Sequence, residues 1–234
     1  MRPTVPSRLP AAATTYPSKV LRPEPGNRAT VAALRRIGLD TIALPLFTVA
    51  PVAWTPPDAH AHDGLLLTSA NAIRHAGAGL ASLAGLPVYA VGAATAAFAR
   101  GAGLDIVATG NEGADAIAAV AAARGHRRLL HLAGRDRTPA PPGVTAVVTV
   151  YQSDEIAVAP SGLRAIEQGV ALLHSPRAAR RFAALAQNLD RTTIRLAALS
   201  EAVAVAAGDG WAEIAVAASP DDAALVALAA RLAD

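Results

Sequence analysis

The sequence has no cysteine and one lysine, Lys19. Without cysteine there can be no disulfides, iron–sulfur clusters, cysteine-bound zinc or thiol nucleophiles. A single lysine leaves almost no place for Schiff-base chemistry or a phosphate-loop lysine. No window reaches the roughly 18 uninterrupted apolar residues of a membrane span, and the first residues lack the apolar core of an export signal. We therefore expect a cytoplasmic protein without a membrane partner.

The sequence also has few aromatic residues and a small net charge. Aromatics make up 3% of the 234 residues, whereas hydrophobic residues, many of them alanine, make up 53%. This composition suits alanine-rich helices packed on valine and leucine strands. The formal net charge of +3 is a mild excess, smaller than nucleic-acid-binding proteins usually carry, so we expect no nucleic-acid partner. The length allows one large domain or two small ones.

An internal repeat organises the chain. The segment LLLTSANAIRHAG, from Leu65, matches ALLHSPRAARRFA, from Ala171, with Ser69 aligned to Ser175 at an offset of 106. Further along, AVGAATAAFA aligns with AALSEAVAVA, GLDIVA with GWAEIAVA, and NEGADAIAAV with SPDDAALVAL, at an offset of about 108. The first pair covers a strand and a helix, so these four pairs of segments represent five elements that recur in the same order, which indicates two related halves.

Short apolar runs alternate with helical segments throughout, a pattern that predicts parallel sheets in an α/β fold. We expect residues 19–50 and 160–234 to form one domain, with a second domain, residues 54–150, inserted into it and a cleft between the two. Residues 1–18 contain several prolines and should form a loosely ordered lead. The segment TIALPLFTV is expected to be one strand, and Gly26 or Asn27 to cap the first helix.

The corners where a strand turns directly into a helix are the main candidate binding sites. Ser69 and Ser175 each stand at such a corner, where free backbone N–H groups and the helix dipole favour anions. Both serines could instead be ordinary helix caps. Thr95 follows a strand and a glycine, but Val91-Gly92-Ala93-Ala94 lacks the third spaced glycine of a dinucleotide site. Thr95 could also serve in capping or packing.

Tyr151 and three arginines complete the candidates. Tyr151 ends the strand TAVVTVY before the chain crosses between the domains, where a phenol could donate a proton or simply pack. Arg22 and Arg135 each follow a strand, where doubly wound sheets bind their ligands, and Arg137 is close to Arg135. All three could equally be surface charges.

The motifs taken together resemble the uroporphyrinogen-III synthase family, from Lys19 to the C-terminus. The similarity rests on LRP, LPLFTVAP, LLLTSANAIRHA, VYAVGAATAAFARGAG, LLHLAGRDR, VTVYQS, LLHSPRAARRFA and LAALSEAVAVAA. The resemblance implies two α/β domains joined by a two-stranded connector, and no metal or organic cofactor. We also expect a monomer.

The implied activity is a cyclising lyase of tetrapyrrole (haem) biosynthesis. Its substrate would be hydroxymethylbilane, a linear tetrapyrrole with eight carboxylates. Loss of the hydroxymethyl hydroxyl gives a cation, a spiro intermediate forms, and the macrocycle closes as uroporphyrinogen III with the terminal ring inverted. The alternative is a non-catalytic two-domain protein that binds an anion or another ligand for regulation.

The resemblance also implies roles for individual residues. Tyr151 would assist loss of the hydroxyl. Departures from the family pattern include the short apolar run before Arg22, Ala70-Asn71 after the first corner serine, and Ser200-Glu201 where the first repeat has Gly92-Ala93. The residues expected to bind substrate are Arg22, Ser69, Ala70, Gly92, Ala93, Thr95, Ser175, Pro176 and Ser200.

Overall fold

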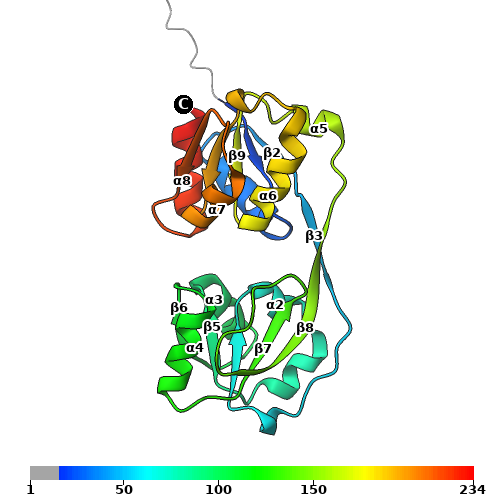
Figure 1. Ribbon diagram of the computed structural model, residues 1–234, viewed down its shortest axis with the longest axis vertical. Coiled ribbons are helices and arrows are strands. Elements are labelled where there is room, and N and C mark those ends of the chain that lie inside the picture. Colours follow the sequence, from blue (N-terminus) through cyan, green and yellow to red (C-terminus); the bar gives the residue numbers. More distant parts are fainter. Residues whose placement is uncertain (1–15) are drawn as a thin grey trace, which may run out of the picture. The chain divides into compact units, whose positions relative to one another are not determined.

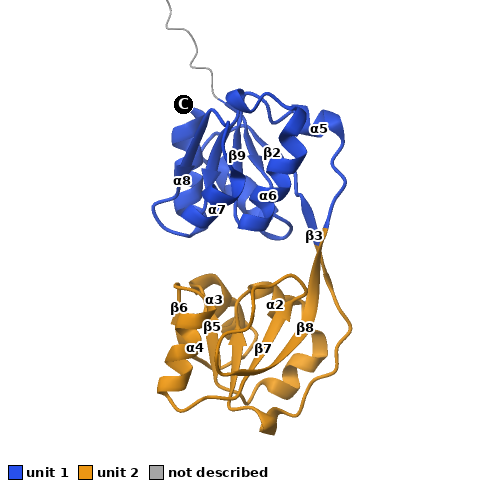
Figure 2. Cartoon of the chain, viewed as in Figure 1, with its two compact units in different colours: residues 1–48, 155–234 blue, residues 49–154 orange. Residues whose placement is uncertain are grey.

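The computed structural model describes residues 16–234. The described chain divides into two compact units (Figure 2). Unit 1 comprises residues 16–48 and 155–234, and unit 2 comprises Val49–Asp154. Each unit contains one predominantly parallel sheet (Figure 1). The predicted α/β class with two sheets is therefore confirmed.

The sheet of unit 1 has the order β11-β10-β9-β1-β2, and its strands are all parallel. The strands are β1 (Ser18–Val20), β2 (Thr41–Ala43), β9 (Val170–Leu173), β10 (Arg195–Ala198) and β11 (Glu213–Val216). The helices are α1 (Gly26–Arg36), α5 (Pro160–Arg164), α6 (Pro176–Leu185), α7 (Glu201–Ala207) and α8 (Asp222–Ala233), with short 3-10 turns η3 (Ala186–Asn188) and η4 (Arg191–Thr193).

The sheet of unit 2 has the order β3-β8-β7-β4-β5-β6. Its strands are β3 (Phe47–Pro51), β4 (Gly64–Leu67), β5 (Val88–Val91), β6 (Ile106–Gly110), β7 (Leu129–Gly134) and β8 (Val144–Glu155). Its helices are α2 (Ala70–His75), α3 (Ala93–Gly101) and α4 (Ala114–Ala123), with 3-10 segments η1 (Ala59–Ala61) and η2 (Gly77–Leu83).

Strands β3 and β8 run from one unit into the other. Ile156 N donates to Leu46 O and Val52 N to Val150 O, so the two segments are antiparallel. They form the two-stranded connector that the resemblance implied. The boundaries of the two predicted domains stay a prediction.

The central strands of each sheet, β4, β5 and β7 in unit 2 and β1, β9 and β10 in unit 1, bury both faces, because helices cover both sides of each sheet. In β4, Leu65 and Leu67 pack against α2 and η2, whereas Leu66 packs against α4. Unit 1 repeats this arrangement: α6 and α7 cover one face of its sheet, and α1 and α8 cover the other. The continuous apolar runs in the sequence reflect this two-sided burial.

Three local expectations were wrong. TIALPLFTV does not form one strand: β2 ends at Ala43, β3 begins at Phe47, and Pro45 between them has no N–H to continue a ladder. Pro25 is the N-cap of α1, and Asn27 lies inside that helix, where its amide nitrogen bonds Val20 O and Arg22 O. Ser18 belongs to β1 and is buried rather than part of a loose lead. The lead over residues 1–15 lies outside the described residues.

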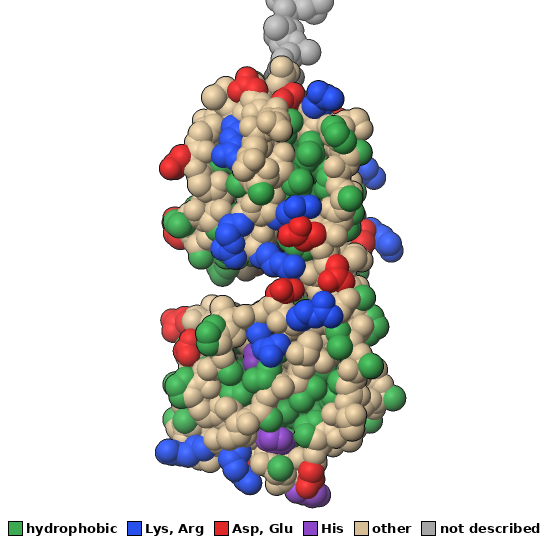
Figure 3. All heavy atoms as spheres, turned by 45° about the vertical axis from the view of Figure 1, so that its right-hand side comes forward, with side chains coloured by type: hydrophobic (Ala, Val, Ile, Leu, Met, Phe, Trp, Pro, Cys, Tyr) green, Lys and Arg blue, Asp and Glu red, His purple; other side chains and the backbone are tan. Residues whose placement is uncertain are grey.

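On the face shown in Figure 3, Lys and Arg side chains lie among Asp and Glu side chains. No helix among residues 16–234 is both long and apolar enough to cross a membrane.

Candidate active site

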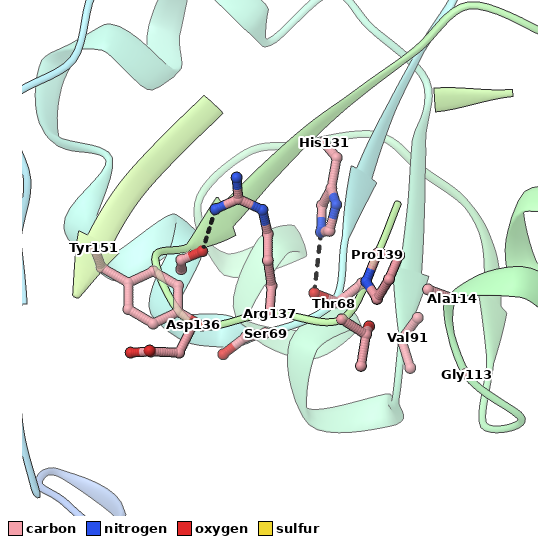
Figure 4. A pocket seen from close by; sticks show the side chains of 12 residues that line it. Thr68, Ser69, Val91, Gly113, Ala114, His131, Asp136, Arg137, Pro139 and Tyr151 are labelled. Atoms are coloured by element: carbon pink, nitrogen blue, oxygen red, sulfur yellow. Dashed lines mark hydrogen bonds between the residues drawn. The ribbon is translucent and has the colours of Figure 1, made fainter. Parts of the chain in front are cut away.

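Unit 2 has a pocket of about 300 Å³ at the carboxyl ends of its central strands (Figure 4). Residues that follow β4 and β6 and the last residue of β5 meet there with residues of the β7–β8 segment. The lining residues are Thr68, Ser69, Val91, Gly113, Ala114, His131, Gly134, Asp136, Arg137, Thr138, Pro139 and Tyr151.

Strand order explains why the pocket forms at this position. From β4 the chain moves through β5 to β6 on one side, and it then returns to β7 and β8 on the other side of β4. The connections after β4 and β7 therefore diverge and leave a crevice between them. Such a switch point, outside the carboxyl ends of parallel strands, is where doubly wound sheets bind their ligands.

Tyr151 lines this pocket from β8, and its ring packs against the backbone of Gly134. A Cβ atom at residue 134 would lie 2.6 Å from the Cζ atom of Tyr151 and 2.9 Å from its hydroxyl oxygen. The ring centroid of His75 is 6.2 Å from that of Tyr151. Burial, and then the charge of Arg74, lowers the pKa of His75, so near neutral pH a neutral imidazole flanks the phenol.

Ser69 lines the same pocket and is the N-cap of α2, where its Oγ accepts a hydrogen bond from Asn71 N at 3.2 Å. Ala70 begins that helix, which has only 6 residues. Ser69 therefore caps α2, which is one of the two roles that the sequence allowed. A helix this short supplies a small dipole.

Thr68 and His131 form a buried polar pair beside Ser69. The Oγ1 atom of Thr68 lies 3.1 Å from Nε2 of His131, whose residue is 4% exposed. Burial, and then the charge of Arg137, lowers the pKa of His131 to about 4, so the ring is neutral near pH 7. No described residue bonds to its buried Nδ1 atom.

Arg137 is held from one side of its guanidinium group. Its Nη1 donates to Gly134 O at 2.8 Å and to Thr149 Oγ1 at 3.0 Å. In Figure 4 the Arg137 side chain lies between Tyr151 and His131, and the Asp136 carboxylate lies on the Tyr151 side. The pocket therefore carries charges of both signs.

Unit 1 has a polar cluster at its own switch point, between β1 and β9. Asp222, the first residue of α8, accepts from Arg22 Nη1 at 3.1 Å, and its Oδ1 lies 3.0 Å from His174 Nε2 and 2.9 Å from Thr30 Oγ1. Burial alone would raise the pKa of Asp222, but the bonds from His174 and Thr30 and the charge of Arg22 outweigh it and lower that pKa.

The remaining predicted residues lie at the starts of other helices. Gly92 is the N-cap of α3 with φ 84°, a conformation that favours glycine, and Ala93 begins that helix. Thr95 is buried in α3 and does not line the pocket. Ser175 caps α6 through Ala178 N at 3.2 Å, Pro176 begins that helix, and Ser200 is the N-cap of α7.

Of the predicted site residues, the structure brings Ser69 and Tyr151 together in one pocket. Sequence reasoning did not select Thr68, His131 or Asp136, and it named Arg137 without giving it a role. One signal was available: His131 is the polar residue of the otherwise apolar strand segment LLHLAG. Within residues 16–234 no group of three or more His, Asp or Glu side chains could hold a metal ion.

Comparisons with known proteins agree on one family. Residues 28–227 match the family model described as Uroporphyrinogen-III synthase HemD. The fold is similar to uroporphyrinogen-III synthetase from Helicobacter pylori, with TM-score 0.62 and 15% identity, covering 93% of this chain and 99% of that one. A mutant uroporphyrinogen III synthase from the extremely thermophilic bacterium Thermus thermophilus gives TM-score 0.54 and 15% identity, covering 91% and 97%. No curated protein matches the sequence.

Proposed function

The chain belongs to the uroporphyrinogen-III synthase family of cyclising lyases, and we propose that its chemistry takes place around Tyr151 in the pocket of unit 2. The reaction would convert hydroxymethylbilane into uroporphyrinogen III and water. This proposal rests on one observation: Tyr151 and Ser69 line the same pocket, at the switch point of the unit 2 sheet.

The Tyr151 hydroxyl is suited to the first step. It would donate its proton to the substrate's hydroxymethyl oxygen while the C–O bond breaks, so that water leaves and the carbon becomes cationic. The Asp136 carboxylate lines the same pocket and lies on the Tyr151 side (Figure 4). A negative charge at this position favours a developing positive charge on the substrate.

The pocket's size limits what it can hold. A volume of about 300 Å³ is at the lower end of ligand sites, which measure roughly 300–1,000 Å³. It can hold one pyrrole ring with its side chains but not a linear tetrapyrrole. We infer that unit 2 fixes the reacting end of the substrate. Positioning of that end should then contribute more to the outcome than proton transfer does.

Substrate contacts by the other predicted residues stay proposals. Gly92, Ala93 and Thr95 of unit 2, together with Ser175, Pro176 and Ser200 of unit 1, would act chiefly through backbone N–H groups near helix starts. Arg22 already forms an ion pair with Asp222, so we expect it to contribute less. That the enzyme is a monomer and works in the cytoplasm is likewise proposed.

The direct test is incubation of the protein with freshly made hydroxymethylbilane, followed by oxidation and separation of the uroporphyrin isomers. We expect the type III isomer to form faster than the spontaneous type I isomer. Only type I product, at the rate without protein, would contradict the proposed function. That result would favour the non-catalytic binding protein.

Tyr151→Phe tests the role of the phenol. If the hydroxyl donates a proton, the rate of type III formation should fall by ~10²-fold, with an unchanged thermal midpoint. An unchanged rate would leave Tyr151 a packing residue.

A further inference from the structure

The two units repeat one plan. In unit 1, β9, α6, β10, α7, β11 and α8 follow one another as β4, α2, β5, α3, β6 and α4 do in unit 2. In each sheet the first of these strands also pairs with a further parallel strand, β1 in unit 1 and β7 in unit 2. Residues at equivalent places in the two switch points can therefore be compared directly.

The switch point of unit 1 is filled by one of the protein's own carboxylates. Asp222 accepts bonds from Arg22, which follows β1, and lies within hydrogen-bond distance of His174, which follows β9. Thr30 Oγ1 is close to both of its oxygens, at 2.9 and 3.0 Å. The donors at this switch point therefore bind a carboxylate.

Unit 2 has a corresponding set of donors but no carboxylate at the equivalent place. Ala114 is the first residue of α4, as Asp222 is of α8, at the repeat offset of 108. Thr68 follows β4 as His174 follows β9, and Arg137 follows β7 as Arg22 follows β1. Ala114, Thr68 and Arg137 all line the open pocket of about 300 Å³.

The hydrogen bonds of the unit 2 donors leave capacity for a ligand. Nη1 of Arg137 is taken by Gly134 O and Thr149 Oγ1, whereas no described residue bonds to its Nε or Nη2. The buried Nδ1 of His131 has no described partner. An unpaired buried N–H is rarer than an unpaired acceptor, so we place the ring proton on Nε2, which donates to Thr68 Oγ1. The Thr68 hydroxyl proton is then available to a ligand.

We propose that the pocket of unit 2 binds a carboxylate between the Arg137 guanidinium and the Thr68 hydroxyl, at the place equivalent to the Asp222 carboxylate in unit 1. His131 is a positioning residue that acts through Thr68. The proposal rests on the proposed function only in taking the ligand to be an acetate or propionate side chain of the substrate.

The position of Asp136, the acidic residue of the pocket, is compatible with carboxylate binding between Arg137 and Thr68. In Figure 4 the Asp136 carboxylate is on the Tyr151 side, whereas Thr68 and His131 are on the other side of Arg137. One end of the pocket therefore suits a substrate carboxylate, and the other end suits the carbon that becomes cationic. A bound carboxylate would orient the reacting ring toward Tyr151.

Ala114→Asp tests the proposal, because it places in unit 2 the carboxylate that unit 1 has. The new side chain should pair with Arg137 and Thr68 and exclude the ligand. Ala114→Asn is the matched control, since it adds nearly the same volume without charge. We expect Ala114→Asp to weaken carboxylate binding by about 10- to 100-fold relative to Ala114→Asn, the worth of one charged hydrogen bond.

Binding is measured by heteronuclear NMR of the Arg137 Nε–H signal during titration with sodium propionate, with propionamide as the neutral comparison. Propionate should shift this signal in the wild type and in Ala114→Asn but not in Ala114→Asp, and propionamide should shift it in none. Equal propionate shifts in both variants, or none in the wild type, would overturn the proposal.

A second pair of variants tests the role of His131 by the same measurement of propionate binding. His131→Gln keeps an N–H donor for Thr68 and should retain propionate binding, whereas His131→Leu should weaken it by about ten-fold. Equal binding by the two variants would remove His131 from the site.

The reciprocal variant is Asp222→Ala in unit 1, which removes the built-in carboxylate from Arg22 and His174. Its thermal midpoint should fall and then rise again with added propionate, because a ligand that binds only the folded state stabilises it. The wild type gives the size of the non-specific salt effect. No greater rise in the variant than in the wild type would contradict the proposed equivalence of the two switch points.

Failure of this proposal can be told apart from failure of the proposed function. If the wild type makes no type III product but propionate shifts Arg137, the carboxylate site stands without the enzyme activity. If the wild type makes type III product and Ala114→Asp has the KM of Ala114→Asn, the activity stands and the carboxylate site does not.

Discussion

At the scale of residues, the position of Tyr151 depends on residue 134 being glycine. The aromatic ring occupies the space that a side chain would need there, with Cζ 2.6 Å and Cε2 2.7 Å from a hypothetical Cβ. Atoms cannot approach this closely, so any larger residue at this site must displace the ring.

Gly134→Ala should therefore move the Tyr151 hydroxyl and reduce type III formation. We expect a loss of about 10- to 100-fold, comparable with removal of a general acid. Gly85→Ala is the matched control, because a Cβ there meets no atom within 4 Å, and it should keep the wild-type rate. The rate is measured by the isomer assay. Wild-type activity in Gly134→Ala would separate the activity from the packing of Tyr151.

Protonation of His131 couples the pocket to stability. The folded protein holds the pKa of His131 at about 4, below the ordinary value of 6.5. As pH falls from 6.5 toward 4, the unfolded chain binds a proton that the folded chain does not. The free energy of unfolding therefore falls in this window, and this loss is absent at higher pH.

His131→Leu should remove that part of the pH dependence. Between about pH 7.5 and about pH 4.5 the wild type should lose roughly 2–3 kcal/mol more stability than the variant. Urea unfolding of both proteins at the two pH values measures the difference. The same loss in both would mean that His131 titrates normally in the folded protein.

At the scale of elements, the two corner serines are helix caps in equivalent places. Ser69 accepts from Asn71 N and Ser175 from Ala178 N, each at 3.2 Å. A capping side chain stabilises the backbone of the first turn. A ligand bound at such a corner through backbone N–H groups would not need the serine hydroxyl.

Ser175→Ala should therefore cost about 1 kcal/mol of stability and reduce activity by less than about three-fold, because the backbone donors remain. Ser200→Ala is the matched control for stability. Ser200 is also an N-cap, but its side chain makes no capping hydrogen bond. Chemical denaturation and the isomer assay measure the two effects. A large loss of activity with unchanged stability in Ser175→Ala would instead assign the hydroxyl to the substrate.

At the scale of the whole molecule, each unit has its own core. Unit 1 has buried clusters on both faces of its sheet, and so does unit 2. Leu67 at the end of β4 and Leu173 at the end of β9 are equivalent in the repeat, and both are completely buried. The two positions allow the stability of each unit to be changed separately.

Leu67→Ala and Leu173→Ala should each destabilise one unit by about 2–5 kcal/mol, the usual cost of such a cavity. In calorimetry we expect Leu67→Ala to lower the transition of unit 2 and Leu173→Ala the transition of unit 1. If both variants shift one shared transition equally, the units unfold as a single cooperative body.

The sequence alone predicted the α/β class, the repeat and most elements, because these depend on local periodicity and on residues close in the chain. The family resemblance, now supported by the match over residues 28–227, also rests on motifs read in order. Local reasoning did not separate β2 from β3. There the apolar run continues past Pro45, and only the sheet assignment shows that the chain changes units.

The tertiary structure alone decided which polar side chains meet. Asp222 is bonded to Arg22, 200 residues earlier, and Thr68 lies beside His131, 63 residues later. Parallel strands bring their carboxyl ends to one edge of a sheet, but the strand order determines which ends are neighbours. The sequence shows which residues end each strand, whereas the order of the strands in the sheet follows from how the helices of the whole unit pack.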